Sequence, residues 1–314
     1  MEKILANRLK KGDTVGLVTP SGVITPKKLN TAVKQIKALG YNTYFKPSVL
    51  SGFGYMAGGD KARAEELMHM FMNNKVDAVW CIRGGYGATR IIDLLDYGLI
   101  QQNPKLFIGY SDITALHTAI LKKTGLVSYH GPMGGSEFNA FSINQFTELL
   151  TTPEETYIFP YKREPETKKN SEFDVYTINP GRAEGELIGG NLNVLNALSG
   201  TDFEPNFQDK IVFLEEIDER PYKVDRMLTQ LMHATNFNRA AGIVFGVFKG
   251  CDNDKKPTFG LKELLFQLIK PLKIPAVYGM SFGHISHNLT LPYGISASLD
   301  AGNFELKLNE RAVK

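Results

Sequence analysis

The stretch KLFIGYSDITALHTAI, residues 105–120, joins an apolar run to a helical pattern within a few residues. The run at 106–108 ends at Gly109 and predicts a buried strand. Apolar residues then recur at helical spacing over 113–120. Ser111 is therefore predicted at a strand-to-helix turn, next to the unpaired N–H groups and the positive dipole end of a helix start.

A serine at such a turn has two interpretations. Held at the carboxyl end of a strand, the Ser111 hydroxyl can serve as a nucleophile while helix N–H groups stabilise an oxyanion. Alternatively, Ser111 or Asp112 simply caps the helix, and the pair taken alone favours capping. A catalytic role requires a base from elsewhere in the chain.

Strands and helices alternate on both sides of this turn. Short apolar runs at 14–20, 41–49, 76–82 and 126–133 alternate with amphipathic stretches at 25–39, 60–73 and 143–150. This order predicts an α/β domain over residues 1–150, with a parallel sheet, helices on both faces and ligands at the carboxyl ends of the strands.

The alternation ends in residues 151–180, which are rich in Pro, Lys, Glu and Asn and are predicted as a linker. Beyond it, residues 181–314 contain strand and helix patterns, and their last part alternates with period two around Gly and Pro. We therefore expect a second domain of mixed β and α structure.

Composition narrows the class of protein. At 314 residues, with 43% hydrophobic and 22% charged residues, the chain is typical of a globular protein with two domains. A net charge of +3 without a dense basic tract gives no sign of a nucleic-acid partner. Cys81 and Cys251 form no CxxC pair, which fits a reducing compartment. No signal peptide or membrane span is predicted, so the cytoplasm is the expected location.

A glycine-rich loop, residues 83–87, follows the strand predicted at 76–82. Its spacing matches neither a dinucleotide fingerprint nor a P-loop. It can form an oxyanion hole or a substrate cradle from backbone N–H groups, or be only a tight turn. Of the six histidines, His284 and His287 lie in a loop between predicted strands, and no zinc-binding spacing occurs, so no metal is expected.

Two adjacent carboxylates, Glu215 and Glu216, end the apolar strand that starts at residue 210. Side chains alternate along a strand, so these two point to opposite sides. One can orient a histidine while the other is solvated, although such a charge run also fits a solvated loop.

The chain resembles the LD-carboxypeptidases, the serine peptidase family that also contains the microcin-immunity peptidases. Eight motifs in the family's order carry the resemblance, almost from end to end: GDTVGLVTPSG, YMAGGD, WCIRGGYG, FIGYSD, HGPM, GELIGGNL, FLEEIDERPYKVDRML and GHISHNLTLPYG. The resemblance implies a flavodoxin-like N-terminal domain and a C-terminal domain of mixed β and α structure.

The resemblance also implies a catalytic triad. The nucleophile falls on Ser111, the acid on Glu215 and the base on His284, so both domains contribute. His287 takes no catalytic role.

Around that triad, the backbone N–H groups of Asp112, Gly84 and Gly85 are our candidates for the oxyanion hole. Arg83, or else Arg226, is the candidate cation for the free carboxylate of a peptide substrate.

By resemblance the substrate is the murein tetrapeptide, from which terminal D-alanine is released during cell-wall turnover and recycling. No cofactor is expected, and a homodimer is implied. The third residue of the peptide, diaminopimelate or lysine, stays open. Two alternatives remain: a microcin-immunity-like peptidase acting on a peptide-nucleotide antibiotic, and a non-catalytic binding module on an amidotransferase-like fold.

Overall fold

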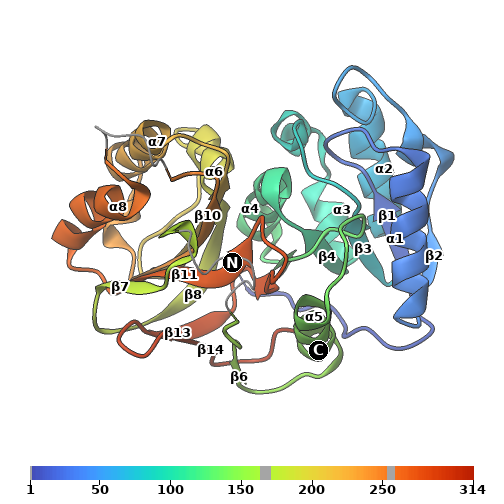
Figure 1. The fold of residues 1–314 in the computed structure, drawn as a ribbon. Helices are drawn as coiled ribbons and strands as arrows, with labels where there is room; N and C mark the ends of the chain where they lie inside the picture. Colours follow the sequence, from blue (N-terminus) through green and yellow to red (C-terminus); the bar gives the residue numbers. More distant parts are fainter. Residues whose placement is uncertain (1, 163–170, 253–258) are drawn as a thin grey trace. The chain divides into compact units, whose positions relative to one another are not determined.

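A computed structural model describes residues 2–162, 171–252 and 259–314 (Figure 1). The chain divides into two compact units. The N-terminal unit holds the residues up to Pro153 together with Thr290–Gly294 and Ala312–Lys314. The C-terminal unit holds Glu154–Leu289 and Ile295–Arg311.

The N-terminal unit is built on a six-stranded sheet of order β12-β5-β4-β3-β1-β2. Strands β1 to β5 pair in parallel, and β12 pairs antiparallel with β5 at one edge of the sheet. The order 2-1-3-4-5 is that of the flavodoxin-like doubly wound fold, as the sequence predicts. The strands are β1 (Thr14–Val18), β2 (Asn42–Tyr44), β3 (Ala78–Cys81), β4 (Leu106–Gly109), β5 (Tyr129–His130) and β12 (Leu291–Pro292).

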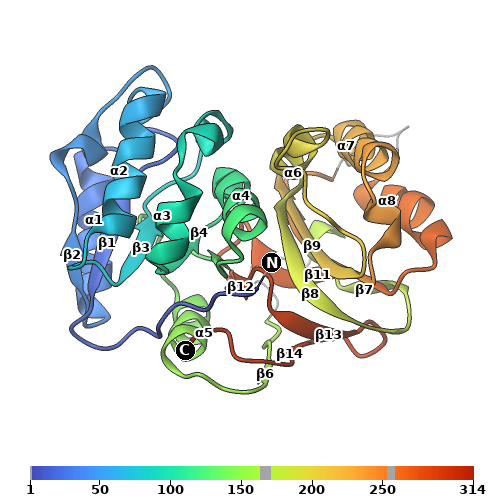
Figure 2. The same cartoon turned by 180° about the vertical axis from the view of Figure 1, so that it is seen from behind.

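Helices cover both faces of this sheet, with α1 and α5 on one face and α2, α3 and α4 on the other (Figures 1 and 2). They are α1 (Pro26–Ala38), α2 (Asp60–Met72), α3 (Tyr97–Gln102), α4 (Thr114–Thr124) and α5 (Ala140–Thr151). Short 3-10 turns complete the unit: η1 (Pro47–Leu50), η2 (Ala88–Arg90), η3 (Ile92–Leu94) and η4 (Ser111–Ile113).

The core of this unit lies against β3 and β4, whose residues are all buried. The only tryptophan, Trp80, stacks on Phe146 with 4.5 Å between ring centroids and donates its indole N–H to the carbonyl of Pro132 at 2.7 Å. It is a core residue.

The C-terminal unit contains an eight-stranded mixed sheet of order β6-β14-β13-β8-β9-β10-β11-β7. Strands β8 to β11 pair in parallel, and antiparallel strands flank them on both sides. The strands are β6 (Tyr157–Ile158), β7 (Tyr176–Asn179), β8 (Arg182–Asn191), β9 (Lys210–Ile217), β10 (Gly242–Lys249), β11 (Ala276–Gly283), β13 (Ser296–Asp300) and β14 (Glu305–Leu308).

Three helices of the C-terminal unit pack in sequence, α6 against α7 and α7 against α8 (Figure 2). They are α6 (Leu192–Leu198), α7 (Pro221–Ala234) and α8 (Leu261–Ile269), with 3-10 turns η5 (Ser171–Phe173), η6 (Phe237–Arg239) and η7 (Lys270–Leu272). The second domain is thus mixed β and α, as expected.

The structure differs from the expected domain boundaries in two places. Residues 151–180, predicted as a linker, contain β6 and β7, which pair with β14 and β11, so the described part of this stretch belongs to the C-terminal unit. Residues 290–294 and 312–314, expected in the second domain, belong to the N-terminal unit because β12 pairs with β5. Hydrophilic composition marked the first segment as a linker, and its short edge strands carry little apolar signal.

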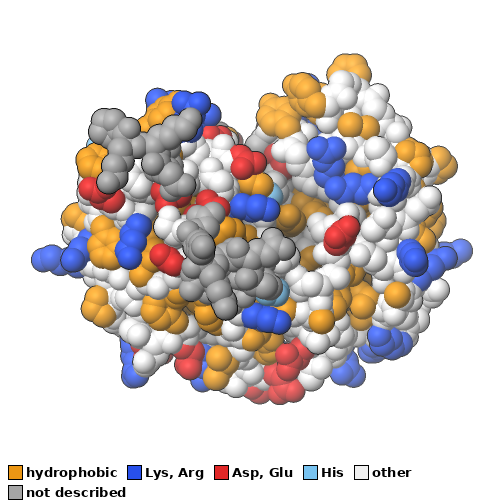
Figure 3. Space-filling view, in the orientation of Figure 1, with side chains coloured by type: hydrophobic (Ala, Val, Ile, Leu, Met, Phe, Trp, Pro, Cys, Tyr) orange, Lys and Arg blue, Asp and Glu red, His pale blue; other side chains and the backbone are white. Residues whose placement is uncertain are grey.

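Charged side chains of both signs are interspersed on the face of each unit seen in Figure 3. Within the described ranges no helix is long and apolar enough to cross a membrane.

Candidate active site

Ser111 lies at the sharp turn predicted from the sequence. Strand β4 ends at Gly109, and η4 begins at Ser111 and leads directly into α4. The backbone of Ser111 has φ 61°, a left-handed conformation that is unfavourable for a residue with a Cβ. A strained serine between a strand and a helix is the geometry of a nucleophile elbow.

His117 fixes the strand end that leads to this turn. Its Nε2 lies 2.8 Å from the carbonyl oxygen of Gly109, and its Nδ1 lies 2.8 Å from the hydroxyl of Ser128. Because a carbonyl only accepts, Nε2 carries the proton and Nδ1 accepts from Ser128. Burial lowers the pKa of His117 to about 3, so this neutral ring is a structural support.

The glycine-rich loop after β3 approaches Ser111 closely. A Cβ placed on Gly84 would lie 3.1 Å from the Cβ of Ser111 and 3.3 Å from its Oγ, so a larger residue there would press on the serine side chain. The carbonyl of Gly84 accepts a hydrogen bond from the N–H of Gly22 at 3.0 Å. Gly85, with φ 110°, lies against the backbone of Gly22. Backbone of the kind needed for an oxyanion hole therefore borders the serine, and Gly84 is nearer to it than Gly85.

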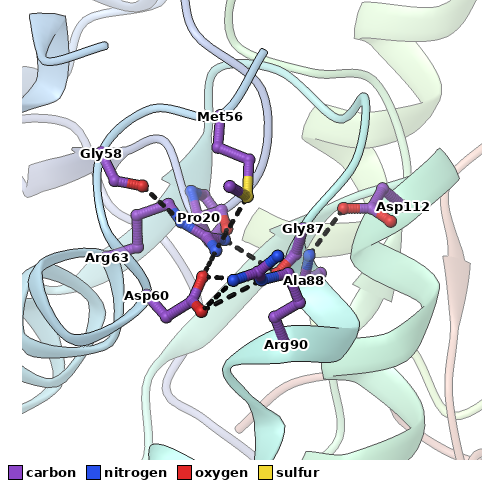
Figure 4. Close-up of polar contacts among 9 residues, drawn as sticks. All are labelled: Pro20, Met56, Gly58, Asp60, Arg63, Gly87, Ala88, Arg90 and Asp112. Carbon is purple, nitrogen blue, oxygen red and sulfur yellow. Dashed lines mark hydrogen bonds and ion pairs between the residues drawn. The ribbon is translucent and has the colours of Figure 1, made fainter. Parts of the chain in front are cut away.

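The carboxylate of Asp112 ties the same loop to the serine turn. Its Oδ2 accepts a 2.8 Å hydrogen bond from the N–H of Ala88 (Figure 4). Burial raises the pKa of Asp112, and the hydrogen bond from Ala88 and the charge of Arg63 partly offset that rise. The carboxylate thus connects two turns, where the sequence left helix capping open.

His284 and Glu215 lie at ion-pair distance from each other within the C-terminal unit. Oε2 of Glu215 lies 2.6 Å from Nδ1 of His284. The Glu215 side chain is fully buried, whereas that of His284 is 15% exposed. A carboxylate at this distance holds the proton on Nδ1 and directs Nε2 to act as the base.

Opposing effects set the proton affinity of His284. Burial alone lowers the pKa of the imidazole, but the charge of Glu215 and its hydrogen bond outweigh that effect, and the net pKa is raised. The imidazolium is therefore stabilised, as a general base that must hold a proton during the reaction requires.

A glycine makes this pair possible. Gly283, the last residue of β11, has φ 117°, and a Cβ there would lie 3.1 Å from the Cβ of Glu215. Its N–H donates to Oδ1 of Asn288 at 3.0 Å, which fixes the start of the loop that carries His284. The GH dipeptide of the motif GHISHNLTLPYG indicates His284 in the sequence, whereas the close approach of Gly283 to Glu215 is visible only in the structure.

Glu216 points to the opposite side of β9, as the alternation of side chains predicts. The expectation that the second carboxylate is solvated is wrong, because Glu216 is only 2% exposed. Its oxygens accept hydrogen bonds from the Asn191 side chain at 3.0 Å, the Ile217 N–H at 2.9 Å and the Asn193 N–H at 2.8 Å. Burial, and then the charge of Glu215, raises the pKa of Glu216 to about 7.

The two candidate cations have different surroundings. Arg83 is exposed on the glycine-rich loop, and its Nη1 donates to the carbonyl of Val23 at 2.6 Å. Arg226 is exposed on α7 and lies over the ring of Tyr222, 5.6 Å from its centroid. Glu219, two residues before α7, pairs with Lys223 at 2.9 Å.

The remaining sequence-based candidates give no sign of a metal site. Buried His287 lies in the same loop as His284. No cluster of three or more His, Cys, Asp or Glu residues able to hold a metal ion occurs in the described ranges.

Comparisons with known proteins place the chain in a family. Family models describe residues 15–131 as an LD-carboxypeptidase N-terminal domain and residues 184–299 as an LD-carboxypeptidase C-terminal domain. The probable murein peptide carboxypeptidase of Bacillus subtilis (strain 168) is 38% identical over 98% of this chain and 96% of its own length. Muramoyltetrapeptide carboxypeptidase from Oxalobacter formigenes has a solved structure that is 32% identical, with a TM-score of 0.81 over 94% of this chain and 97% of that one. The microcin C7 self-immunity protein MccF of Escherichia coli is 27% identical over 98% of this chain and 96% of its own length.

These similarities define a hydrolase of the peptidase class. The chain belongs to the LD-carboxypeptidase family.

Proposed function

We propose that this protein is a serine LD-carboxypeptidase that releases terminal D-alanine from the murein tetrapeptide during cell-wall turnover and recycling. The observation that carries the proposal is the buried pair of Glu215 and His284, 2.6 Å apart. A carboxylate that orients an imidazole is the activating part of a serine triad, and the strained turn at Ser111 supplies a matching nucleophile.

In the proposed mechanism Ser111 Oγ attacks the carbonyl carbon of the third residue, and Nε2 of His284 takes the hydroxyl proton. Glu215 stabilises the imidazolium that forms. The imidazolium then gives its proton to the leaving amine of D-alanine, and an acyl-enzyme remains. Water, activated by the same histidine, releases the tripeptide. The mechanism requires Nε2 of His284 and Ser111 Oγ to come within hydrogen-bonding distance.

Negative charge develops on the carbonyl oxygen of the substrate during the attack. We assign its stabilisation to the backbone N–H groups of Asp112 and of Gly84 or Gly85. Of the two glycines, Gly84 lies nearer to Ser111. Arg83 is the preferred cation for the free carboxylate of D-alanine, because it adjoins Gly84 on the same loop. Arg226, which stacks on Tyr222, is the second choice.

A test compares bond stereochemistry. The protein is incubated with the tetrapeptide, with the same peptide carrying a D-configured third residue, and with a pentapeptide ending in D-Ala-D-Ala, and products are identified by mass spectrometry. We expect tripeptide and D-alanine from the first peptide only. Comparable cleavage of the pentapeptide terminus contradicts the LD assignment. Peptides with diaminopimelate or lysine at the third position establish which is preferred.

A second candidate is a microcin-immunity-like peptidase, favoured by the similarity to MccF over nearly the whole chain. A peptide-nucleotide conjugate added to the same assay separates the two functions. Cleavage of the conjugate without release of D-alanine from the tetrapeptide supports the second. The cytoplasmic location and the homodimer stay predictions.

A further inference from the structure

We propose that Arg63 is a positioning residue for the oxyanion-binding backbone beside Ser111. The inference rests on the proposed serine mechanism. Arg63 lies in the first turn of α2, distant in sequence from the triad, and its side chain is only 1% exposed.

The Arg63 guanidinium binds backbone carbonyls of three separate loops (Figure 4). Its Nη1 donates to the carbonyl of Gly87 at 2.8 Å and also to that of Pro20, and its Nε donates to the carbonyl of Gly58 at 3.2 Å. One planar, permanently charged group therefore joins the loop after β1, the loop before α2 and the glycine-rich loop after β3.

The peptide between Gly87 and Ala88 is held at both ends. Arg63 binds its carbonyl oxygen, and the Asp112 carboxylate binds its N–H at 2.8 Å. Gly87 has φ 123°, and a Cβ there would lie 2.9 Å from Nη1 of Arg63. The orientation of this peptide plane is thus fixed between Arg63 and the residue that directly follows Ser111.

Arg63 also supports Gly84 by a second route. It holds Pro20, two residues before Gly22, and the N–H of Gly22 donates to the carbonyl of Gly84. Two of the supports of the loop segment against Ser111 therefore include Arg63. Preorganised donors act only when held within about 0.5 Å of the productive position, so loss of these supports is expected to lower the rate of the chemical step.

The charge balance fits a positioning role. Asp60 pairs with Nη2 of Arg63 and, at 2.7 Å, with Nη2 of the exposed Arg90. Apolar side chains of similar volume often stabilise a protein core at least as much as a buried ion pair does, so stability alone does not account for a buried arginine here. A buried guanidinium directed at three carbonyls instead specifies where those carbonyls lie.

The test uses Arg63→Met, the conservative Arg63→Lys and a matched control. Lys105→Met is the control because Lys105 is also a buried cation of the N-terminal unit that donates to backbone carbonyls, those of Met70 and Asn73 at the other end of α2. Lys105 directly precedes β4, whereas Ser111 follows the other end of that strand. A p-nitrophenyl phosphonate titrates active sites. The serine oxygen bonds to phosphorus, p-nitrophenolate leaves, and the serine proton passes to the base.

For Arg63→Met we expect kcat per titrated site to fall on the order of 10²-fold, comparable to loss of one oxyanion donor, with KM within about threefold. The pH midpoint of the reaction stays at the wild-type value, and Arg63→Lys gives an intermediate rate. Lys105→Met keeps kcat per titrated site within about twofold, even if its melting temperature falls equally.

Equal kcat per titrated site in the Arg63→Met and Lys105→Met proteins overturns the proposal. If Arg63→Met does not fold, Arg63→Lys and Gly87→Ala decide: reduced kcat supports the proposal and wild-type kcat overturns it. A wild-type protein that reacts with the phosphonate without releasing D-alanine refutes only the proposed substrate, and the phosphonylation rate constants then test Arg63. A wild-type protein that does neither overturns both.

Discussion

Oε2 of Glu215 lies 2.6 Å from Nδ1 of His284, a contact made where the Glu215 carboxylate is fully buried. A carboxylate buried at this distance is a strong, charge-assisted acceptor. It selects the imidazole tautomer with its proton on Nδ1, which makes Nε2 the basic nitrogen.

Glu215→Gln removes this charge with little change in shape. We expect kcat to fall on the order of 10⁴-fold, as for the corresponding change in the known serine triad, because the amide permits the wrong tautomer and no longer stabilises imidazolium. The measurement is kcat at saturating tetrapeptide, with a thermal melt to establish that the variant is folded. A folded variant with near-normal turnover would rule out Glu215 as the triad acid.

Glu216→Gln is the matched comparison, since the same change is made one residue away. Glu216 binds the start of α6 on the side of β9 opposite to Glu215, so we expect kcat to fall about tenfold or less. Stability should fall more clearly, because the amide N–H₂ group cannot accept from the Asn193 N–H. A severe loss of kcat here, with normal turnover in Glu215→Gln, would reverse the assignment. Small effects in both would direct attention to Asp218 and Glu219.

The pH profile of kcat/KM is expected to show the raised pKa of His284. The base must be neutral, and a raised pKa keeps it protonated to a higher pH than an ordinary histidine of about 6.5. The acid limb should therefore have its midpoint above pH 6.5. In Glu215→Gln the attraction is lost and burial remains, so the residual activity should show a midpoint at lower pH. A wild-type midpoint below 6.5 contradicts this assignment.

Stability should depend on Glu216 between about pH 4.5 and 7. The folded protein holds a proton on this carboxyl up to a pKa of about 7, whereas the unfolded chain loses it near 4.5. The stabilising contribution is fully present below pH 4.5 and disappears as pH rises through 7. Thermal melts across this range should show a steeper decline in the wild type than in Glu216→Gln. Parallel curves would show that Glu216 titrates normally.

Activity should survive chelation. The proposed steps use only a serine, a histidine, a carboxylate and backbone N–H groups, so EDTA followed by dialysis should leave kcat unchanged. The tetrapeptide assay before and after treatment measures this. Loss of activity that zinc restores would contradict the serine mechanism.

Sequence patterns predicted the architecture of the N-terminal unit well because its central strands β3 and β4 are buried on both faces. Runs such as 106–108 read as continuous apolar segments, and the turn after Gly109 follows directly from them. The spacing of Ile91, Leu94 and Leu95 predicts a helix, and this prediction is wrong, since the segment forms the 3-10 turns η2 and η3. Contacts of its flanking loops, including Gly87 with Arg63, override the helical periodicity there.

At the candidate site, sequence patterns predicted which residues are present and to which side of a strand they point, but not how deeply each side chain is buried or what it contacts. Alternation along β9 correctly placed Glu215 and Glu216 on opposite sides, yet the burial of Glu216 depends on α6, which no local pattern links to it. The role of Gly283 likewise depends on contact with a residue 68 positions earlier. Long-range contacts of this kind leave no periodic signal in a single sequence.

The return of residues 290–294 and 312–314 to the N-terminal unit has a consequence for the order of synthesis. The hydroxyl of Tyr129 on β5 donates to the carbonyl of Ala312 at 2.6 Å, and β12 completes the sheet edge beside β5. A ribosome that has made the residues up to Pro153 has therefore made an N-terminal unit that lacks its last strand and this contact. The sheet of the serine-bearing unit is therefore complete only after residues 154–289 of the C-terminal unit have been synthesised.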